Sequence, residues 1–145
     1  QGKVRLLETS RGVTIEINDS ILFPAGQAKL QPASVSALLA IAKVLAVSDF
    51  PITIEGHTDN VPIATPQFPS NWELSAMRAT SVLRLFNDGG VGAERLTAIG
   101  YGETRPLETN TTLEGKARNR RVSILIDSNR PEEPTELKDA RPIGQ

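Results

Sequence analysis

Apolar and polar residues alternate along several segments of the chain, the pattern of strands that are buried on one face. We predict strands over 13–18, 52–57, 96–101 and 121–126, with a weaker strand over 4–7 before the first. The strand 52–57 has Ile52 and Ile54 on its apolar side, and its opposite face carries the polar residues Thr53, Glu55 and His57. Segment 21–26 follows a break in this pattern and is predicted to be an apolar loop.

A change to helical spacing occurs in two longer segments. Pro32 suits the first turn of a helix, where a missing N–H costs nothing, and apolar residues then recur every three or four positions. We therefore predict an amphipathic helix over 32–47, and a short helix over 111–117 near the last strand.

The second long helix is predicted over 71–87. Ser70 and Glu73 form a capping-box signature at its start, and the glycines after residue 88 end it. With about 100° per residue, one sector of this helix is apolar and is the predicted core stripe. Its members are Trp72, Ala76, Ala79, Leu83 and Phe86.

Strands that alternate with helices predict an α+β fold, a two-layer sandwich in which helices pack on one face of a small mixed sheet. The 145 residues suit a single domain with a tail. We place the domain at 13–127, after a linker or weak strand over 1–12. Segment 128–145 is rich in proline and charge and poor in apolar residues, so it is predicted to be a disordered tail.

Composition and charge exclude several kinds of function. A formal net charge of −1 argues against a duplex DNA partner, and the short basic cluster over 116–121 has no interleaved aromatic residues. No apolar run approaches the ~20 residues that span a bilayer, and no signal peptide is visible. Because residue 1 is not Met, we expect a fragment or a processed product.

The inventory of reactive side chains argues against an enzyme. The chain has no cysteine and a single histidine, His57, so thiolate or histidine metal sites and His-based triads lack their members. No nucleophile stands beside a base in any motif, and no cofactor is expected. His57 is expected to have a structural role, fixing the turn that presents Asp59.

Two polar segments form a candidate site. Asn71, Ser75 and Arg78 share a sector of the second long helix, although spacing alone favours a solvated polar face. Asp59 follows the strand 52–57, and ligands of α/β sheets bind beyond the carboxyl ends of strands. We expect Asp59 and Arg78 to face each other across a cleft; the alternative is a turn-capping Asp with Arg78 as its ion-pair partner.

Four ordered motifs resemble the C-terminal domain of OmpA over residues 13–126. They are Gly56-His57-Thr58-Asp59-Asn60, Asn71-x-x-Leu74-Ser75-x-x-Arg78-Ala79, Gly100-Tyr101-Gly102-Glu103 and Asn119-Arg120-Arg121-Val122. The longer loop with its Pro-Ser-Asn-Trp run over 69–72 is more similar to the stator B subunits of flagellar motors than to porins or the Pal lipoprotein.

The resemblance implies binding of the peptidoglycan stem peptide, especially its diaminopimelate, without catalysis. In that family an Asp and an Arg at the positions of Asp59 and Arg78 grip this zwitterion, and a carboxylate and a guanidinium suit its ammonium and carboxylate groups. Secondary contacts are implied at Thr58, Asn71, Leu74, Ser75 and Arg120. Relatives carry an Asp after the Phe matched to Phe23, whereas this chain has Pro24, which removes one possible ligand carboxylate.

The resemblance also implies a cellular setting. A stator subunit would be a homodimer, with this chain as the periplasmic domain of an inner-membrane protein, and residues before Gln1 would join it to the ion-channel stator A subunit. The alternative is a generic envelope tether of the OmpA or Pal type that holds a membrane protein to peptidoglycan without a motor role.

Overall fold

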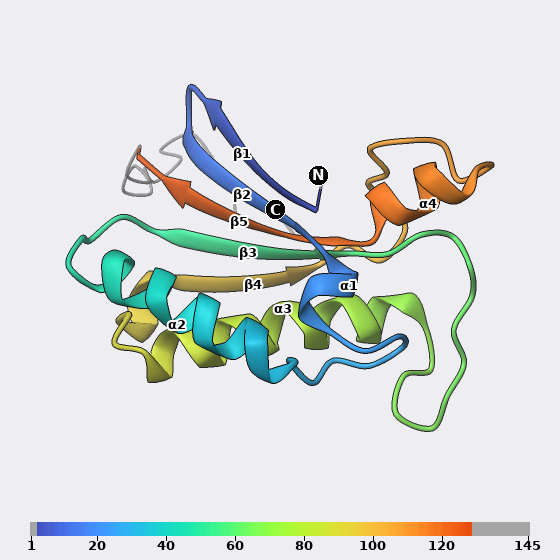
Figure 1. The fold of residues 1–145 in the computed structure, drawn as a ribbon, viewed down its shortest axis with the longest axis horizontal. Helices are drawn as coiled ribbons and strands as arrows, with labels where there is room; N and C mark the ends of the chain where they lie inside the picture. Colours follow the sequence, from blue (N-terminus) through green and yellow to red (C-terminus); the bar gives the residue numbers. More distant parts are fainter. Residues whose placement is uncertain (1–2, 129–145) are drawn as a thin grey trace, which may run out of the picture.

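The computed structural model describes residues 3–128, which form an open five-stranded sheet with two long helices on one face (Figure 1). This arrangement confirms the predicted α+β class with its two layers. The elements follow one another as β1 (Val4–Thr9), β2 (Gly12–Asn18), α1 (Asp19–Leu22), α2 (Pro32–Ala46), β3 (Ile52–His57), α3 (Asn71–Asp88), a 3₁₀ turn (Ala93–Arg95), β4 (Leu96–Gly100), α4 (Leu113–Asn119) and β5 (Arg121–Asp127).

The sheet is mixed, with the strand order β1-β2-β5-β3-β4. All neighbours are antiparallel except β3 and β4, which are parallel. Residues 4–9 pair with β2 along its length, from Val4 opposite Ile17 to Thr9 opposite Gly12, so they form an edge strand of the sheet rather than a linker. The carboxyl ends of β2, β3 and β4 therefore meet the start of β5 at one end of the sheet (Figure 1).

One apolar core lies between the sheet and helices α2 and α3. Ile52 and Ile54 of β3 are fully buried in it, as their alternation predicts, and Ile124 lies beside Ile54 on β5. Leu38 and Ala42 from α2 and Val82 and Phe86 from α3 close the core from the other layer. Burying side chains of this size stabilises the fold by ~1.5–3 kcal/mol each.

Two short helices differ from the sequence prediction. Residues 19–22 form the one-turn helix α1, where an apolar loop was expected, because the Asn18 side chain caps it by accepting a hydrogen bond from the Ser20 N–H. Helix α4 spans 113–119, two residues later than predicted, because the Thr112 hydroxyl caps it by accepting from the Gly115 N–H.

The predicted tail lies outside the described residues, apart from residue 128. Within residues 3–128, no helix combines the length and apolar character needed to cross a membrane.

The buried face of α3 is rotated from the predicted stripe. Trp72 and Ala76 are exposed, whereas Asn71, Ser75 and Arg78 are buried. Glycines in the sheet explain the rotation, because α3 rests directly on them: a Cβ on Gly56 would lie 2.1 Å from the Ser75 carbonyl oxygen. The polar sector thus faces the sheet, so the interpretation of this sector as a solvated face and the placement of Trp72 in the core are both wrong.

Candidate functional site

A cavity of about 270 Å³ opens at the end of the sheet where β3 ends and β5 begins. Helix α1, the first turns of α3 and the loop 58–70 surround it. Its lining combines charged and apolar side chains: Asp19, Gly26, Thr58, Asp59, Val61, Pro62, Ile63, Asn71, Leu74, Arg78 and Arg120. Six of the seven residues predicted for ligand binding therefore line one cavity, and Ser75 is the seventh.

Arg78 is held rigidly at the bottom of this site, with only 3% of its surface exposed. Its Nε donates to the Gln27 carbonyl oxygen at 2.8 Å, and its Nη1 donates to Asp19 Oδ2 at 2.9 Å. The guanidinium also lies over the Phe23 ring, 4.9 Å from the centroid, a cation–π contact. Burial lowers the pKa of Arg78, and the Asp19 carboxylate opposes that shift, so the group stays charged.

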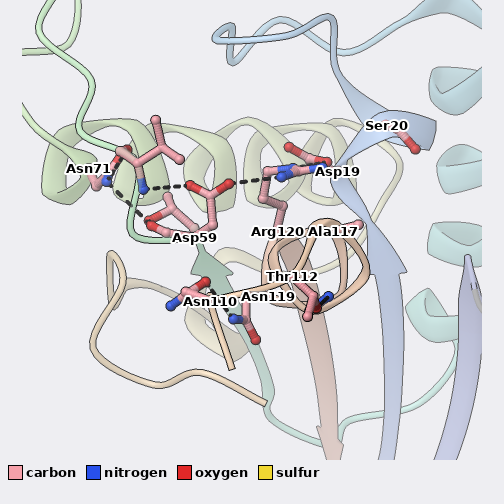
Figure 2. A network of polar contacts seen from close by, with 12 residues as sticks. Asp19, Ser20, Asp59, Asn71, Asn110, Thr112, Ala117, Asn119 and Arg120 are labelled. Carbon is pink, nitrogen blue, oxygen red and sulfur yellow. Dashed lines mark hydrogen bonds and ion pairs between the residues drawn. The ribbon is translucent and has the colours of Figure 1, made fainter. Parts of the chain in front are cut away.

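Asp59 is oriented by its own loop and by the chain that enters β5. Its Oδ1 accepts a hydrogen bond from the Val61 N–H at 3.0 Å, which forms an Asx turn. Its Oδ2 accepts from Arg120 Nη1 at 2.8 Å. Figure 2 shows the carboxylate of Asp59 between these contacts, with Asn71 on the other side. This geometry fixes the carboxylate without burying it out of reach of the cavity.

Asp59 and Arg78 line the same cavity, as expected, and each is held in an ion pair with another residue: Arg78 with Asp19, and Asp59 with Arg120. Arg120 Nε also lies 3.6 Å from Asp19 Oδ1, so Arg120 spans both carboxylates (Figure 2). The alternative prediction was a turn-capping Asp59 in an ion pair with Arg78. Asp59 does cap a turn, but its ion-pair partner is Arg120, so the predicted partner is wrong. Two carboxylates and two guanidinium groups thus meet around one cavity, with formal charges that cancel.

Asp19 is the site residue that the sequence prediction missed. It lies at the start of α1 and is only 8% exposed. Acidic residues are rarely so buried unless they are paired, and Asp19 is paired with Arg78 and Arg120. The N-capping residue Asn18 just before it was a signal in the sequence, since Ser, Thr, Asp or Asn before an apolar run marks a helix start. Asp19 also supplies a second carboxylate to the site although Pro24 stands where relatives carry an Asp.

Asn71, Thr58 and Leu74 shape the wall beside Asp59. The Asn71 amide donates to the carbonyl oxygen of Val61 at 3.0 Å and so ties the loop to α3. Thr58 is buried, and its N–H donates to the Gly102 carbonyl oxygen at 2.9 Å. Leu74 gives the cavity an apolar side and packs with Phe68 of the loop.

Ser75 lies behind the cavity rather than in its lining, with none of its surface exposed. Its hydroxyl donates to the Trp72 carbonyl oxygen at 3.1 Å and accepts from the Gly102 N–H at 2.9 Å. Ser75 therefore joins α3 to the turn after β4.

His57 lies on the opposite face of the sheet from the helices, where its alternation with Ile52 and Ile54 places it. It is buried, its ring stacks on Tyr101 with centroids 5.1 Å apart, and its Nε2 lies 3.7 Å from Glu55 Oε1. These contacts pack the end of β3 against the turn after β4, just before Asp59. Among the described residues no group of three or more His, Asp or Glu side chains is arranged to hold a metal ion.

Comparison with known families agrees with this architecture. The sequence profile of the OmpA family matches residues 22–120, which include α2, β3, α3, β4 and Arg120. The chain belongs to the OmpA family. Motility protein B of Bacillus subtilis is 42% identical over 120 residues, which cover 81% of this chain and 46% of the relative. The chain spans about half the length of the curated relatives that it matches.

Solved structures of OmpA-family domains share the whole fold. The cell wall anchor of the T6SS from Pseudomonas aeruginosa superposes with a TM-score of 0.82 at 36% identity, covering 88% of this chain and 89% of that one. The periplasmic domain of MotB from Helicobacter pylori superposes with a TM-score of 0.78 at 28% identity, covering 86% and 81%. This OmpA-family domain is therefore similar both to motility proteins and to a cell wall anchor of another machine.

Proposed function

We propose that this domain binds peptidoglycan without catalysis, by holding the zwitterionic end of diaminopimelate in the cavity between α1, α3 and the loop 58–70. The observation that carries the proposal is the charge-balanced cluster of Asp19, Asp59, Arg78 and Arg120 around a cavity with an apolar wall. A zwitterion brings one charge of each sign, so its entry keeps the cluster neutral.

Arg78 and Arg120 differ in exposure, and this difference gives each a separate role in binding. The Arg78 side chain is 4% exposed and clamped by three contacts, so it offers a fixed guanidinium to the ligand carboxylate. Its hydrogen bonds to described residues leave from Nε and Nη1, and Nη2 is left for the ligand. The Arg120 side chain is 38% exposed, so it can turn away from Asp59 when an ammonium group arrives.

Asp59 is the proposed acceptor for that ammonium. The hydrogen bond from the Val61 N–H keeps its carboxylate in place when Arg120 leaves. Binding then exchanges internal ion pairs for ligand ion pairs, and the net gain is smaller than the ~1.5–3 kcal/mol of each charge-assisted bond alone. The remainder of the affinity comes from the apolar wall of Val61, Pro62, Ile63 and Leu74 against the methylene chain of the ligand.

Co-sedimentation of the protein with purified peptidoglycan sacculi tests this function. We expect the parent protein to sediment and Asp59→Ala to lose at least about tenfold in affinity, equivalent to about 1.4 kcal/mol. Asp88→Ala, an exposed Asp at the other end of α3, is the matched control and should sediment as the parent does. Equal sedimentation of parent and Asp59→Ala would show that the wall is bound elsewhere or not at all.

We further propose that the domain lies in the periplasm and anchors the stator of a flagellar motor, as a homodimer joined to an ion-channel subunit. The similarity to Motility protein B over most of this chain supports this role. A tether without a motor role is the second candidate, because the similarity to a T6SS cell wall anchor is as extensive.

A domain exchange separates the two roles. If residues 1–145 replace the matching part of Motility protein B in Bacillus subtilis, a stator anchor restores swimming, and the exchange that also carries Asp59→Ala does not. Wall binding without swimming would favour the tether.

A further inference from the structure

The one tryptophan of the chain has no part in the site described above. Trp72 stands in the first turn of α3, yet 54% of its surface is exposed, and within residues 3–128 its indole N–H has no hydrogen-bond partner. Large aromatic side chains with a free polar group are typical of binding surfaces, where they bury much area at little entropic cost. The folded domain leaves most of that area unused.

The position of the ring relates it to the cavity. One side of Trp72 rests on the backbone at Gly102, where a Cβ would lie 3.5 Å from the ring, and Gly102 has the positive φ of +59° that keeps this place free of a side chain. The next residue, Glu103, lies 3.5 Å from the Asn71 amide through its Oε1. Asn71 lines the cavity and Trp72 is the next residue of α3, so the ring lies near the rim of the cavity without lining it.

We propose that Trp72 is a platform for the sugar rings of the glycan strand to which the bound stem peptide is attached. The inference rests on the proposed function, since it takes the diaminopimelate end to lie in the cavity. A pyranose presents C–H groups with partial positive charge, which pack on the negative face of an aromatic ring. Its hydroxyl groups would find acceptors in the exposed carboxylates of Glu73, the next residue on α3, and Glu103, the residue after Gly102.

The chemistry of the surroundings favours sugar over an acidic or apolar protein segment. Glu73 follows Trp72 on α3 and Glu103 follows Gly102, on which the ring rests, and both are exposed, so an acidic partner would be repelled. Ala76, one turn after Trp72 on α3, is small, and Met77 is the other large apolar side chain exposed on this helix. The described α3 therefore carries two exposed large apolar side chains rather than the broad apolar patch used by protein partners. A neutral polyhydroxylated ligand with one apolar face fits both features.

Because Trp72 is the only tryptophan, its fluorescence reports this contact directly. The parent protein is titrated with a sugar-free stem tetrapeptide and, separately, with the disaccharide tetrapeptide, while calorimetry gives both affinities. We expect the disaccharide ligand alone to shift the emission to shorter wavelength and to protect the ring from acrylamide. It should bind about two- to tenfold more tightly than the tetrapeptide.

Variants separate this contact from the proposed grip on the peptide. Trp72→Ala should remove the advantage of the disaccharide and leave tetrapeptide affinity unchanged; Trp72→Phe should keep part of it. Leu113→Ala, which changes an exposed apolar residue on α4, should change neither. If the disaccharide ligand binds without altering Trp72 emission, or keeps its advantage in Trp72→Ala, the glycan platform is wrong and the proposed function stands. If neither ligand binds the parent, both proposals are wrong.

Discussion

Removal of Asp19 probes the ion-pair cluster most sharply, because it separates stability from binding. In Asp19→Ala the guanidinium of Arg78 loses its carboxylate while staying almost fully buried. Breaking a buried pair from one side typically costs ~3–5 kcal/mol, because a charge is left without compensation.

The contacts that remain place the cost at the lower end of that range. Arg78 keeps its hydrogen bond to Gln27 and its contact with the Phe23 ring, and Arg120 keeps its ion pair with Asp59. We therefore expect the free energy of unfolding to fall by about 3 kcal/mol and the melting temperature by about 10 °C. Glu108→Ala, which breaks the exposed pair with Arg118, is the control and should cost at most about 1 kcal/mol.

Urea denaturation of a double-mutant cycle with Arg78→Met measures the coupling. The double variant should be more stable than Asp19→Ala alone, because the uncompensated charge is gone, with a coupling energy of about 2 kcal/mol. Asp19→Ala should also keep or raise the affinity for a carboxylate ligand, since it frees Nη1 of Arg78. Additive losses, with no coupling between the two positions, would refute the claim that Asp19 compensates Arg78.

Three further predictions follow from single contacts. Arg78→Lys should lose at least about tenfold in affinity for diaminopimelate by calorimetry, because one ammonium cannot bond Gln27 and Asp19 and still present a fixed donor to the ligand as the planar guanidinium does; an affinity within twofold of the parent contradicts it. Gly56→Ala should cost about 1–3 kcal/mol in urea denaturation, because its Cβ meets the α3 backbone; an unchanged midpoint contradicts it. The hydrogen bond from Ser70 lowers the pKa of Glu73 in the folded state. The ionised Glu73 therefore stabilises the fold at pH values above its ordinary pKa of 4.5, and this contribution is lost as pH falls through the lower pKa of the folded state. Glu73→Gln should flatten this part of the curve of stability against pH.

Periodicity was sufficient to predict the strands and the extent of the two long helices. It failed on the rotation of α3, because helix orientation depends on what the sheet offers as a surface. Gly56 and Gly100 remove two side chains beneath α3, so the helix backbone sits on the sheet and its polar sector is covered. As a result Trp72, the largest side chain in the first turn of α3, lies outside the core.

The sequence predicted most of the residues that line the site, but it did not predict which of them form ion pairs with each other. Asp59 was found because it follows the carboxyl end of β3, and Arg78 because it shares a sector of α3 with Asn71 and Ser75. Their actual partners lie far away in sequence, Asp19 59 residues before Arg78 and Arg120 61 residues after Asp59. Pairings over such separations are fixed by the strand order, which places β2 and β5 beside each other, and local patterns carry no information about it.

Calorimetry of the parent domain with two stem tetrapeptides, one with meso-diaminopimelate and one with lysine at the third position, tests the central claim most directly, because peptide bonds then occupy the α-amino and α-carboxyl groups of both residues. The two ligands share an ammonium on a methylene chain, but the lysine side chain ends without the second carboxylate that Arg78 is proposed to hold. Leaving that buried guanidinium without its ligand typically costs about 1–3 kcal/mol, so lysine should bind at least about fivefold more weakly. Equal affinities would contradict the proposal that this cluster recognises a zwitterion.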